Sequence, residues 1–334
     1  MLNVAVLGAG FMGGAHARAF ARLEDVNLIA VSSRSEERAR ALAEELGCEW
    51  TTDSMALVDD PRVEAVSITL PTHLHRDATL AAFAAGKDVL VEKPMALTVE
   101  DCDAMIAAAD EADRLLMVAH VLRFWPEYVA LAEVLQSGEL GAPISAVASR
   151  LCEPPGWAEW FKDASLSGGE VLDLHIHDLD TLNWLFGEPD TLYAQGRRGA
   201  HGGWDQAMTM IDYGGVKCFA EGNAIMPAGY PFTMTLSVRC ELGNVEYTLR
   251  AGGEQVDSSA DGINSLMVYQ PGQPPRVLEM EAGDGYQNEV AYFAKCVQEG
   301  SRPQFGTGAQ GRLAVKTALA ARQSIETGEV IRFW

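Results

Sequence analysis

The chain has 334 residues, 48% of them hydrophobic, and carries a formal net charge of −22. A single hydrophobic core rarely grows to this size, so we expect two globular domains. A charge this negative repels nucleic acid and anionic membrane surfaces, because both bind proteins through a cationic face, and we therefore expect neither as a partner.

The cysteines and the N-terminus bear on the compartment. Six cysteines are scattered without a Cys-x-x-Cys pair, which speaks against a zinc ribbon or a disulfide framework and fits a reducing compartment. The first residues, MLNVAVLGAG, run directly into a strand-like segment without the features of a secretion signal. No apolar run reaches the roughly 18 residues that span a bilayer. We therefore predict a cytoplasmic protein without membrane segments.

The first motif is a glycine-rich turn between a strand and a helix. The segment NVAVLGAGFMGGAHARAFARL has a short apolar run, then glycines at G-x-G-x-x-G spacing, then an alanine-rich helical stretch. The first glycine permits the turn, the second lets the backbone approach a pyrophosphate, and the third allows close helix packing. The pattern predicts a dinucleotide-binding unit whose cofactor contacts are Gly8, Gly10, Phe11, Met12 and Gly13.

The end of the second strand, in VNLIAVSSRSEERAR, bears on the choice of cofactor. An Asp or Glu there would bind the adenosine 2′-hydroxyl of NAD, but this chain has Ser32 and Ser33. Without a carboxylate to repel a 2′-phosphate, and with Arg34 and Arg38 available to pair with one, NADP is preferred over NAD. We expect Ser33, Arg34 and Arg38 to bind the cofactor. If both arginines are ordinary surface residues, NAD is the alternative.

Strands and helices continue to alternate. Strands are expected at residues 63–71, 87–94 and 114–124, with helices at 76–86 and at 98–112, the latter capped by Thr98. This alternation predicts βαβ units and a parallel sheet, which binds ligands beyond the carboxyl ends of its strands. The motifs PTHLH and EKP occupy two such ends, and the residues expected near the cofactor are Pro71, Thr72, His75, Glu92 and Lys93. His75 could equally be an ordinary loop histidine.

After about residue 122 the pattern changes to period-two alternation. Stretches such as AMTMIDYG, VKCFAEGNA and FTMTLSVRCE are separated by Gly, Asn and Pro, which indicates an antiparallel or mixed sheet. Two helices that end at glycines, 286–300 and 311–328, close the chain. A sheet with an uncovered face commonly becomes a subunit interface, so we expect a homodimer or homotetramer through it. We place the domains at 1–121 and 122–334.

The stretch GGEVLDLHIHDLD, residues 168–180, concentrates acidic residues and histidines. Moving a hydride off a carbinol carbon leaves an oxygen that must lose its proton, and histidine titrates near neutral pH. Asp173 and His177 are four residues apart on a helix expected to begin after Gly169, so both should project from one face. His175 and His177, two residues apart, would diverge and so would not share a metal ion. We predict an acid-base cluster and no metal.

The chain resembles the glucose-fructose oxidoreductase and inositol dehydrogenase (Gfo/Idh/MocA) family. Four motifs occur in the family's order and spacing over nearly the whole chain: GAGFMG, PTHLHRDATLAAFAAGKDVLVEKPMA, SGGEVLDLHIHDLDTLNWLFG and NEVAYFAKCVQEG…ARQSIETG. The resemblance implies an α/β Rossmann domain with a doubly wound parallel sheet, followed by an α+β domain with a large, mostly antiparallel open sheet. It also implies NAD(P)-dependent hydride transfer at a secondary hydroxyl or keto carbon of a sugar, cyclitol or related polyol.

Three catalytic roles follow from this resemblance. Lys93 would bind the reacting oxygen, His177 would exchange its proton, and Asp173 would orient the imidazole. The chemistry agrees, because a lysine near the nicotinamide supplies positive charge where alkoxide character develops, and an aspartate near a helix N-terminus is stabilised as an anion. Many relatives have glycine where this chain has His175.

Substrate contacts are expected from residues that also have plainer interpretations. Trp157 and Trp160 could stack on a sugar or simply pack, and Lys162 could bind a hydroxyl or be an ordinary surface lysine. Arg123 could line the cleft, and His175 could line the pocket or pack. Two other functions are alternatives: a cofactor-binding regulator without turnover, because a fold does not guarantee chemistry, and a metal-dependent lyase or hydrolase.

Overall fold

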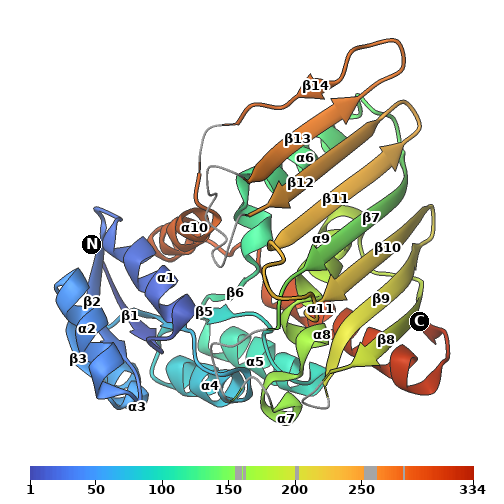
Figure 1. Ribbon diagram of the computed structural model, residues 1–334. Coiled ribbons are helices and arrows are strands. Elements are labelled where there is room, and N and C mark those ends of the chain that lie inside the picture. Colours follow the sequence, from blue (N-terminus) through green and yellow to red (C-terminus); the bar gives the residue numbers. More distant parts are fainter. Residues whose placement is uncertain (155–159, 161–162, 200–202, 252–261, 281–282) are drawn as a thin grey trace. The chain divides into compact units, whose positions relative to one another are not determined.

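The computed structural model describes residues 1–334 except 155–159, 161–162, 200–202, 252–261 and 281–282 (Figure 1). The chain forms two compact units. The first comprises Met1–Trp125 and Gly283–Arg312, and the second comprises Pro126–Ala282 and Leu313–Trp334. This division differs from the predicted boundary between residues 121 and 122, because a segment near the C-terminus joins the first unit.

The first unit contains a six-stranded parallel sheet in the order β3-β2-β1-β4-β5-β6. This is the doubly wound order of dinucleotide-binding folds, and it confirms the predicted Rossmann domain. Its central strands are covered on both faces, which explains why AVSI and DVLVE are almost entirely buried. The strands are β1 (Leu2–Leu7), β2 (Val26–Ser32), β3 (Glu49–Thr51), β4 (Ala65–Ile68), β5 (Asp88–Glu92) and β6 (Leu116–Ala119).

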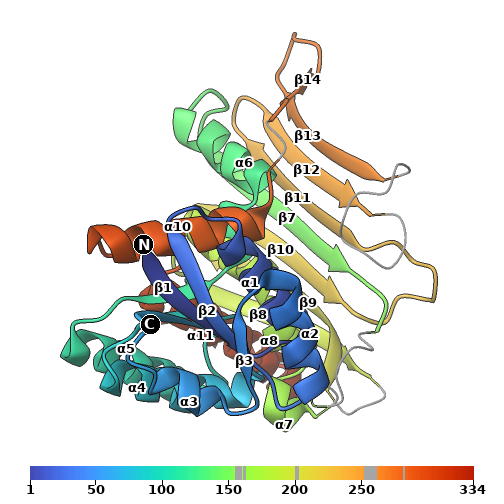
Figure 2. The same ribbon diagram turned by 90° about the vertical axis from the view of Figure 1, so that its left-hand side faces the viewer.

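Helices cover both faces of this sheet, with α1 and α10 on one side and α4 and α5 on the other (Figure 2). The local sequence sets where they begin: the side chain of Ser35 caps α2, and that of Thr98 caps α5 as expected. The helices are α1 (Phe11–Ala21), α2 (Glu36–Leu46), α3 (Ser54–Val58), α4 (His75–Ala84), α5 (Val99–Ala112) and α10 (Gly285–Glu299), with short 3₁₀ turns η1 (Thr72–Leu74) and η2 (Val121–Phe124).

The helix α10 packs in the first unit although it is distant in sequence. The rings of Phe293 and of Phe20 in α1 meet edge to face, with centroids 6.3 Å apart. The Gln287 side chain donates a hydrogen bond to the carbonyl of Ala19, and that of Asn288 to the carbonyl of Phe124. A contiguous boundary cannot describe this arrangement, because the helical pattern of residues 286–300 does not reveal which sheet the helix covers.

The second unit contains a nine-stranded sheet in the order β14-β13-β12-β11-β7-β10-β9-β8-β15. Neighbouring strands are antiparallel except for β7 and β10, which confirms the expected mostly antiparallel sheet. Its strands are β7 (Pro143–Leu151), β8 (Thr191–Arg198), β9 (Trp204–Tyr213), β10 (Val216–Asn223), β11 (Thr233–Cys240), β12 (Asn244–Arg250), β13 (Ile263–Tyr269), β14 (Arg276–Val277) and β15 (Ile331–Arg332). Its helices are α6 (Pro126–Ser137), α7 (Ala164–Ser167), α8 (Glu170–Asp173), α9 (Ile176–Phe186) and α11 (Gly308–Thr327), whose first turn belongs to the first unit.

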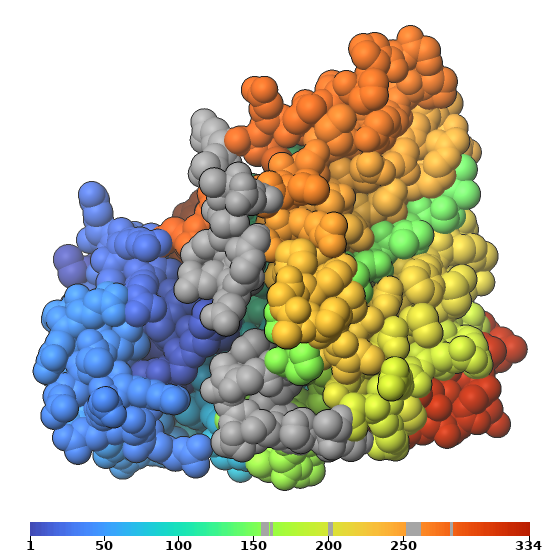
Figure 3. All heavy atoms as spheres, viewed as in Figure 1, coloured from blue at the N-terminus to red at the C-terminus, as the bar shows by residue number. Residues whose placement is uncertain are grey.

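The two faces of the nine-stranded sheet differ in burial. The helices α6, α9 and α11 lie behind the sheet in Figure 1, and β7 residues such as Ala148 are buried beneath them. On the opposite face Tyr193, Met210, Phe219 and Val147 stand side by side on β8, β9, β10 and β7. Met210 is 51% exposed and Val147 is 48% exposed. In Figure 3, which shows this face, no helix of the described residues covers β7 to β13.

Candidate active site

The turn between β1 and α1 has room only for glycine at two positions. Gly8 has a φ of +114°, which L side chains rarely adopt, and a Cβ on Gly13 would lie 1.7 Å from the carbonyl oxygen of Gly8. A Cβ on Gly10 would meet nothing within 4 Å, and Gly10 caps α1 without a side-chain hydrogen bond. No cap side chain therefore blocks an anion from the helix N-terminus, beside which Phe11 is 74% exposed and Met12 is half-buried. These features fit a dinucleotide pyrophosphate.

Two exposed arginine side chains follow β2. Ser33 accepts a hydrogen bond from the backbone N–H of Ser35. Arg34 and Arg38 are exposed, and within the described part of the chain neither guanidinium has a hydrogen-bond or ion-pair partner. Two such cations beside a strand end without a carboxylate suit a 2′-phosphate. The preference for NADP stays a prediction.

Thr69, a residue that the sequence reasoning missed, joins the end of β4 to the glycine turn. Its hydroxyl donates to the carbonyl of Gly8 at 2.9 Å, and its backbone N–H donates to that of Leu7 at 2.9 Å. A polar residue directly after a central strand was the available signal. Pro71 precedes η1 and Thr72 is 5% exposed. Their predicted cofactor contacts stay predictions.

His75 is the first residue of α4 and is buried. The side chain is 1% exposed, with Nδ1 lying 2.9 Å from the carbonyl oxygen of Pro94 and Nε2 lying 2.7 Å from that of Leu70. Burial lowers its pKa. Both ring nitrogens face backbone oxygens, so His75 joins the loop after β4 to the loop after β5, and its predicted cofactor contact stays a prediction.

Glu92 likewise binds its own protein, not an open surface. It is 5% exposed, its Oε2 accepts a hydrogen bond from the backbone N–H of Lys93 at 2.9 Å, and its Oε1 lies 3.1 Å from Nε2 of His16. Burial alone would raise the pKa of Glu92, but the hydrogen bond and charge of His16 lower it overall. This carboxylate fixes the backbone N–H of the half-buried Lys93, and the predicted cofactor contact of Glu92 stays a prediction.

The motif in the second unit departs from the single helix that was predicted. The helix α8 ends at Asp173 and α9 begins at Ile176, with a turn at Leu174 and His175 between them. There the N–H of His175 reaches the carbonyl of Glu170 at 2.9 Å, one residue further back than in an α-helix. Such wide turns are frequent at functional sites.

Asp173 and His177 nevertheless share one property that their neighbours lack. Of the ten residues from 171 to 180, these two are half-buried and the other eight are buried. Because only they reach the surface of this segment, a substrate can reach them and not the residues between. Their catalytic roles stay predictions.

His175 is buried, as in the packing alternative, and its predicted contact with substrate stays a prediction. Its side chain is 1% exposed, and its Nε2 lies 2.8 Å from the hydroxyl of Thr209. A Cβ added to Gly222 would lie only 2.8 Å from the Cβ of His175. Burial is the main cause that lowers the pKa of His175 to about 3. The imidazole therefore stays neutral and fills the space above a glycine of β10.

The residue after His177 is held by a buried ion pair. Arg150 donates to both carboxylate oxygens of Asp178 at 3.1 Å, and the two side chains are 4% and 1% exposed. Burial raises the pKa of Asp178, while the charge and hydrogen bonds of Arg150 oppose that rise. The Asp178 carboxylate is therefore bound to Arg150. The buried contacts of His175 and Asp178 fix the backbone on both sides of His177.

Comparison with known proteins agrees with both units. Residues 2–120 match the model of an oxidoreductase family with an NAD-binding Rossmann fold, Gfo/Idh/MocA, and residues 128–246 match that family's C-terminal domain. The chain belongs to the Gfo/Idh/MocA family. The family assignment confirms the predicted resemblance and the predicted class of cofactor, NAD(P).

Similar members of the Gfo/Idh/MocA family cover almost the whole chain. Myo-inositol 2-dehydrogenase of Thermotoga maritima is 29% identical over 97% of this chain and 96% of its own length. D-xylose 1-dehydrogenase (NADP⁺) 2 of Haloferax volcanii is 30% identical over 90% of both chains. The structure of levoglucosan dehydrogenase in complex with NADH and levoglucosan is 25% identical with a TM-score of 0.83, and 99% of each chain is covered.

The remaining predicted substrate contacts of this Gfo/Idh/MocA chain are Arg123, Trp157, Trp160 and Lys162. Arg123 is in η2 and 3% exposed, and Trp160 is half-buried. Trp157 and Lys162 lie outside the described residues. Their contacts with substrate stay predictions.

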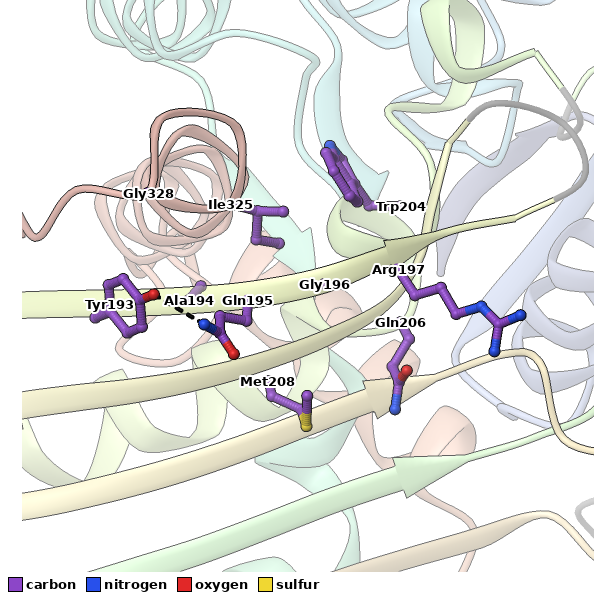
Figure 4. Close-up of a pocket in the computed structure, with 10 residues that line it drawn as sticks. All are labelled: Tyr193, Ala194, Gln195, Gly196, Arg197, Trp204, Gln206, Met208, Ile325 and Gly328. Carbon is purple, nitrogen blue, oxygen red and sulfur yellow. Dashed lines mark hydrogen bonds between the residues drawn. The ribbon is translucent and has the colours of Figure 1, made fainter.

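Three further observations delimit the site. A pocket of about 440 Å³ lies in the second unit where β8 and β9 meet α11, and residues such as Tyr193, Gln206 and Met208 line it (Figure 4). None of the predicted site residues lines this pocket. The described residues contain no group of three or more His, Cys, Asp or Glu side chains that could hold a metal. Within the same residues, no helix is long and apolar enough to cross a membrane.

Proposed function

We propose that this protein is an NAD(P)-dependent dehydrogenase or reductase that acts on a secondary hydroxyl or keto group of a sugar, cyclitol or related polyol. The observation that carries the proposal is the exposure pattern of residues 171–180, in which only Asp173 and His177 escape burial. The glycine turn supports a dinucleotide as cofactor. The substrate class is supported by relatives named as inositol and D-xylose dehydrogenases.

The chain's own residues would divide the work as follows. The bound nicotinamide supplies hydride transfer at its C4 atom. His177 takes the hydroxyl proton of the substrate as the hydride leaves, and returns it in reduction. Asp173 would orient the imidazole and stabilise its charged form. Lys93 places a positive charge beside the oxygen on which negative charge develops.

The catalytic assignment is tested by His177→Ala and Lys93→Met with myo-inositol and D-xylose as first substrates. Loss of a general base lowers turnover by roughly 10²–10⁴-fold. Because His177 is not among the expected cofactor contacts, cofactor affinity measured on the His177→Ala preparation serves as the control and should remain within about threefold. Turnover that survives His177→Ala would refute the assignment, and cofactor binding by a wild type without turnover would favour a regulator.

We also propose that NADP is the preferred cofactor, through Arg34 and Arg38. Titration with NADPH and NADH, followed by cofactor fluorescence at moderate salt, should show tighter binding of NADPH. Replacing both arginines by serine should weaken NADPH binding at least about tenfold, since each loses a charge-assisted hydrogen bond, and leave NADH unchanged. Arg40→Ser is the matched control, because Arg40 lies on α2 beside Glu36 and Glu44. Preferred binding of NADH would make Arg34 and Arg38 ordinary surface residues.

The open face of the nine-stranded sheet supports a homodimer or homotetramer. The row formed by Tyr193, Met210, Phe219 and Val147 is apolar, in register across four strands and partly exposed, which is the character of a subunit interface. Sedimentation of the full chain at moderate salt tests this, and a monomer at micromolar concentration would refute it. We further propose a cytoplasmic location, with which the six free thiols are consistent.

A further inference from the structure

Four buried polar side chains meet behind the Lys93 segment in the first unit. His16 of α1 lies with Nδ1 2.8 Å from the hydroxyl of Ser67 in β4 and with Nε2 3.1 Å from Oε1 of Glu92 at the end of β5. Glu289 of α10 approaches the same Nε2 atom to 3.9 Å. His16, Ser67 and Glu289 are fully buried, and Glu92 is 5% exposed. Two carboxyl groups therefore compete for one imidazole nitrogen.

The contacts of the two carboxyl groups are unequal. Each oxygen of Glu92 has a close polar neighbour: Nε2 of His16 lies at an ion-pair distance of 3.1 Å from Oε1, and the backbone N–H of Lys93 donates a hydrogen bond to Oε2. Among the residues that the structure describes, neither oxygen of Glu289 has a hydrogen-bond partner. A buried carboxylate without a partner is costly, and a carboxyl in this position avoids the cost by remaining protonated. Burial and the neighbouring charge of Glu92 raise the pKa of Glu289 well above its usual range.

We infer that His16 and Glu289 are positioning residues for Lys93: a neutral Glu289 leaves the His16 imidazole to Glu92, whose other oxygen fixes the Lys93 backbone. The importance of Lys93 rests on the proposed function. The network itself rests on distances and burial in one unit.

The sign of the pH dependence follows from the neutral state of Glu289. Because its pKa is raised, the protonated Glu289 carboxyl stabilises the His16–Glu92 contact at low pH. This stabilisation is lost as the pH rises through the raised pKa of Glu289. Ionisation would place a second negative charge beside Glu92 and draw His16 away from it. The charged or titratable groups that face this network are His16 on α1, Glu92 and Lys93 after β5, His75 on α4 and Glu289 on α10.

The test uses hydrogen–deuterium exchange of the Lys93 backbone amide in the full chain, which requires no substrate or cofactor. Exchange is resolved to single residues by fragmentation and corrected for the intrinsic rate at each pH. The amide of Val89 in the same strand, which donates to the carbonyl of Leu115 at 2.8 Å, reports any general loosening. The variants are His16→Leu, which removes the imidazole, His16→Gln, which keeps a polar side chain of similar length beside Glu92, and Glu289→Gln, which mimics the neutral acid.

His16→Leu should raise exchange at Lys93 at least about tenfold relative to Val89, since the Glu92 carboxylate loses its partner. His16→Gln should restore the ratio to within about threefold. Glu289→Gln should match the wild type at pH 7 but lack the wild type's rise in the ratio at alkaline pH. The inference is overturned if His16→Leu leaves the ratio unchanged, or if Glu289→Gln raises it at pH 7 as His16→Leu does.

Three further results bear on the inference: general loosening in His16→Leu, the kcat of His16→Leu, and the turnover of Lys93→Met. If His16→Leu also raises exchange at Val89, the Glu289→Gln variant decides. The inference is overturned if the Lys93-to-Val89 exchange ratio of Glu289→Gln still rises at alkaline pH, and it is supported if that rise is absent. With a substrate, His16→Leu should lower kcat on the order of 10²-fold with KM and cofactor affinity little changed, because a displacement of about 1 Å suffices. Retained turnover in Lys93→Met would refute the proposed function alone and leave the exchange result standing.

Discussion

Replacing Arg150 with methionine would leave the Asp178 carboxylate buried without its partner. The two side chains are 4% and 1% exposed and are joined by two hydrogen bonds of 3.1 Å. Removing one member of a buried pair costs about 3–5 kcal/mol, because the remaining charge stays desolvated. Each kcal/mol shifts Tm by about 2–4 °C in a domain of 150–250 residues, so Arg150→Met should lower the Tm of the second unit by roughly 10 °C.

The deficit should depend on pH in a defined direction. Burial raises the pKa of Asp178, and Arg150 opposes that rise, so the pKa climbs further when the arginine is absent. An acid with a raised folded-state pKa weakens the fold only where it is ionised. The Tm deficit of Arg150→Met should therefore shrink as the pH falls from 7 to 5. Adding Asp178→Leu should recover most of the stability at pH 7, because no buried charge then remains.

Thermal unfolding of the full chain, followed by circular dichroism at both pH values, measures these effects. Arg250→Met is the matched control: Arg250 is exposed, lies over the ring of Tyr230, and should change Tm by no more than about 2 °C. The reasoning fails if Arg150→Met unfolds as the control does, or if the double variant is as unstable as Arg150→Met.

Three other predictions concern the cofactor site, the subunit interface and metal dependence. Gly10→Ala should leave Tm nearly unchanged and weaken NADPH binding. Gly13→Ala should lower both Tm and NADPH affinity, because only the Gly13 methyl would collide with the carbonyl of Gly8. If thermal unfolding and fluorescence titration show the same changes for the two variants, this prediction is wrong. Met210→Asp should shift sedimentation toward the monomer, since it buries a charge in the proposed interface, and an unchanged oligomer would exclude this face. Dialysis against EDTA should not alter turnover, and a loss that zinc or magnesium restores would revive the metal-dependent alternative.

The glycine spacing and the alternation of strands and helices were enough to predict the Rossmann unit. The reason is local: turns that require glycine and short buried strands leave signatures within a few residues of sequence. The period-two stretches likewise predicted the mostly antiparallel sheet. The same stretches could not give its strand order, in which β7 pairs with β10 and β11, because pairing partners far apart in sequence leave no local trace.

The candidate site divides in a similar way. Sequence spacing brought Asp173 and His177 together as a pair, and the structure leaves these two as the partly exposed residues of their segment. Sequence spacing could not predict the wide turn at Leu174 and His175, because His175 packs against a glycine of β10 that is distant in sequence. Nor could it predict that Glu92 is buried beside His16.

The sequence by itself determined the family, the cofactor class and the chemical types at the site, because these depend on which residues are present and how closely they are spaced. Tertiary structure decided which of those polar residues are engaged inside the protein. His16, His75 and Glu289 carry no sequence sign of burial, yet each is fully or nearly fully buried. Their roles arise from helices and strands that meet only after folding, where desolvation and nearby partners set whether a side chain holds the scaffold or is left for the substrate.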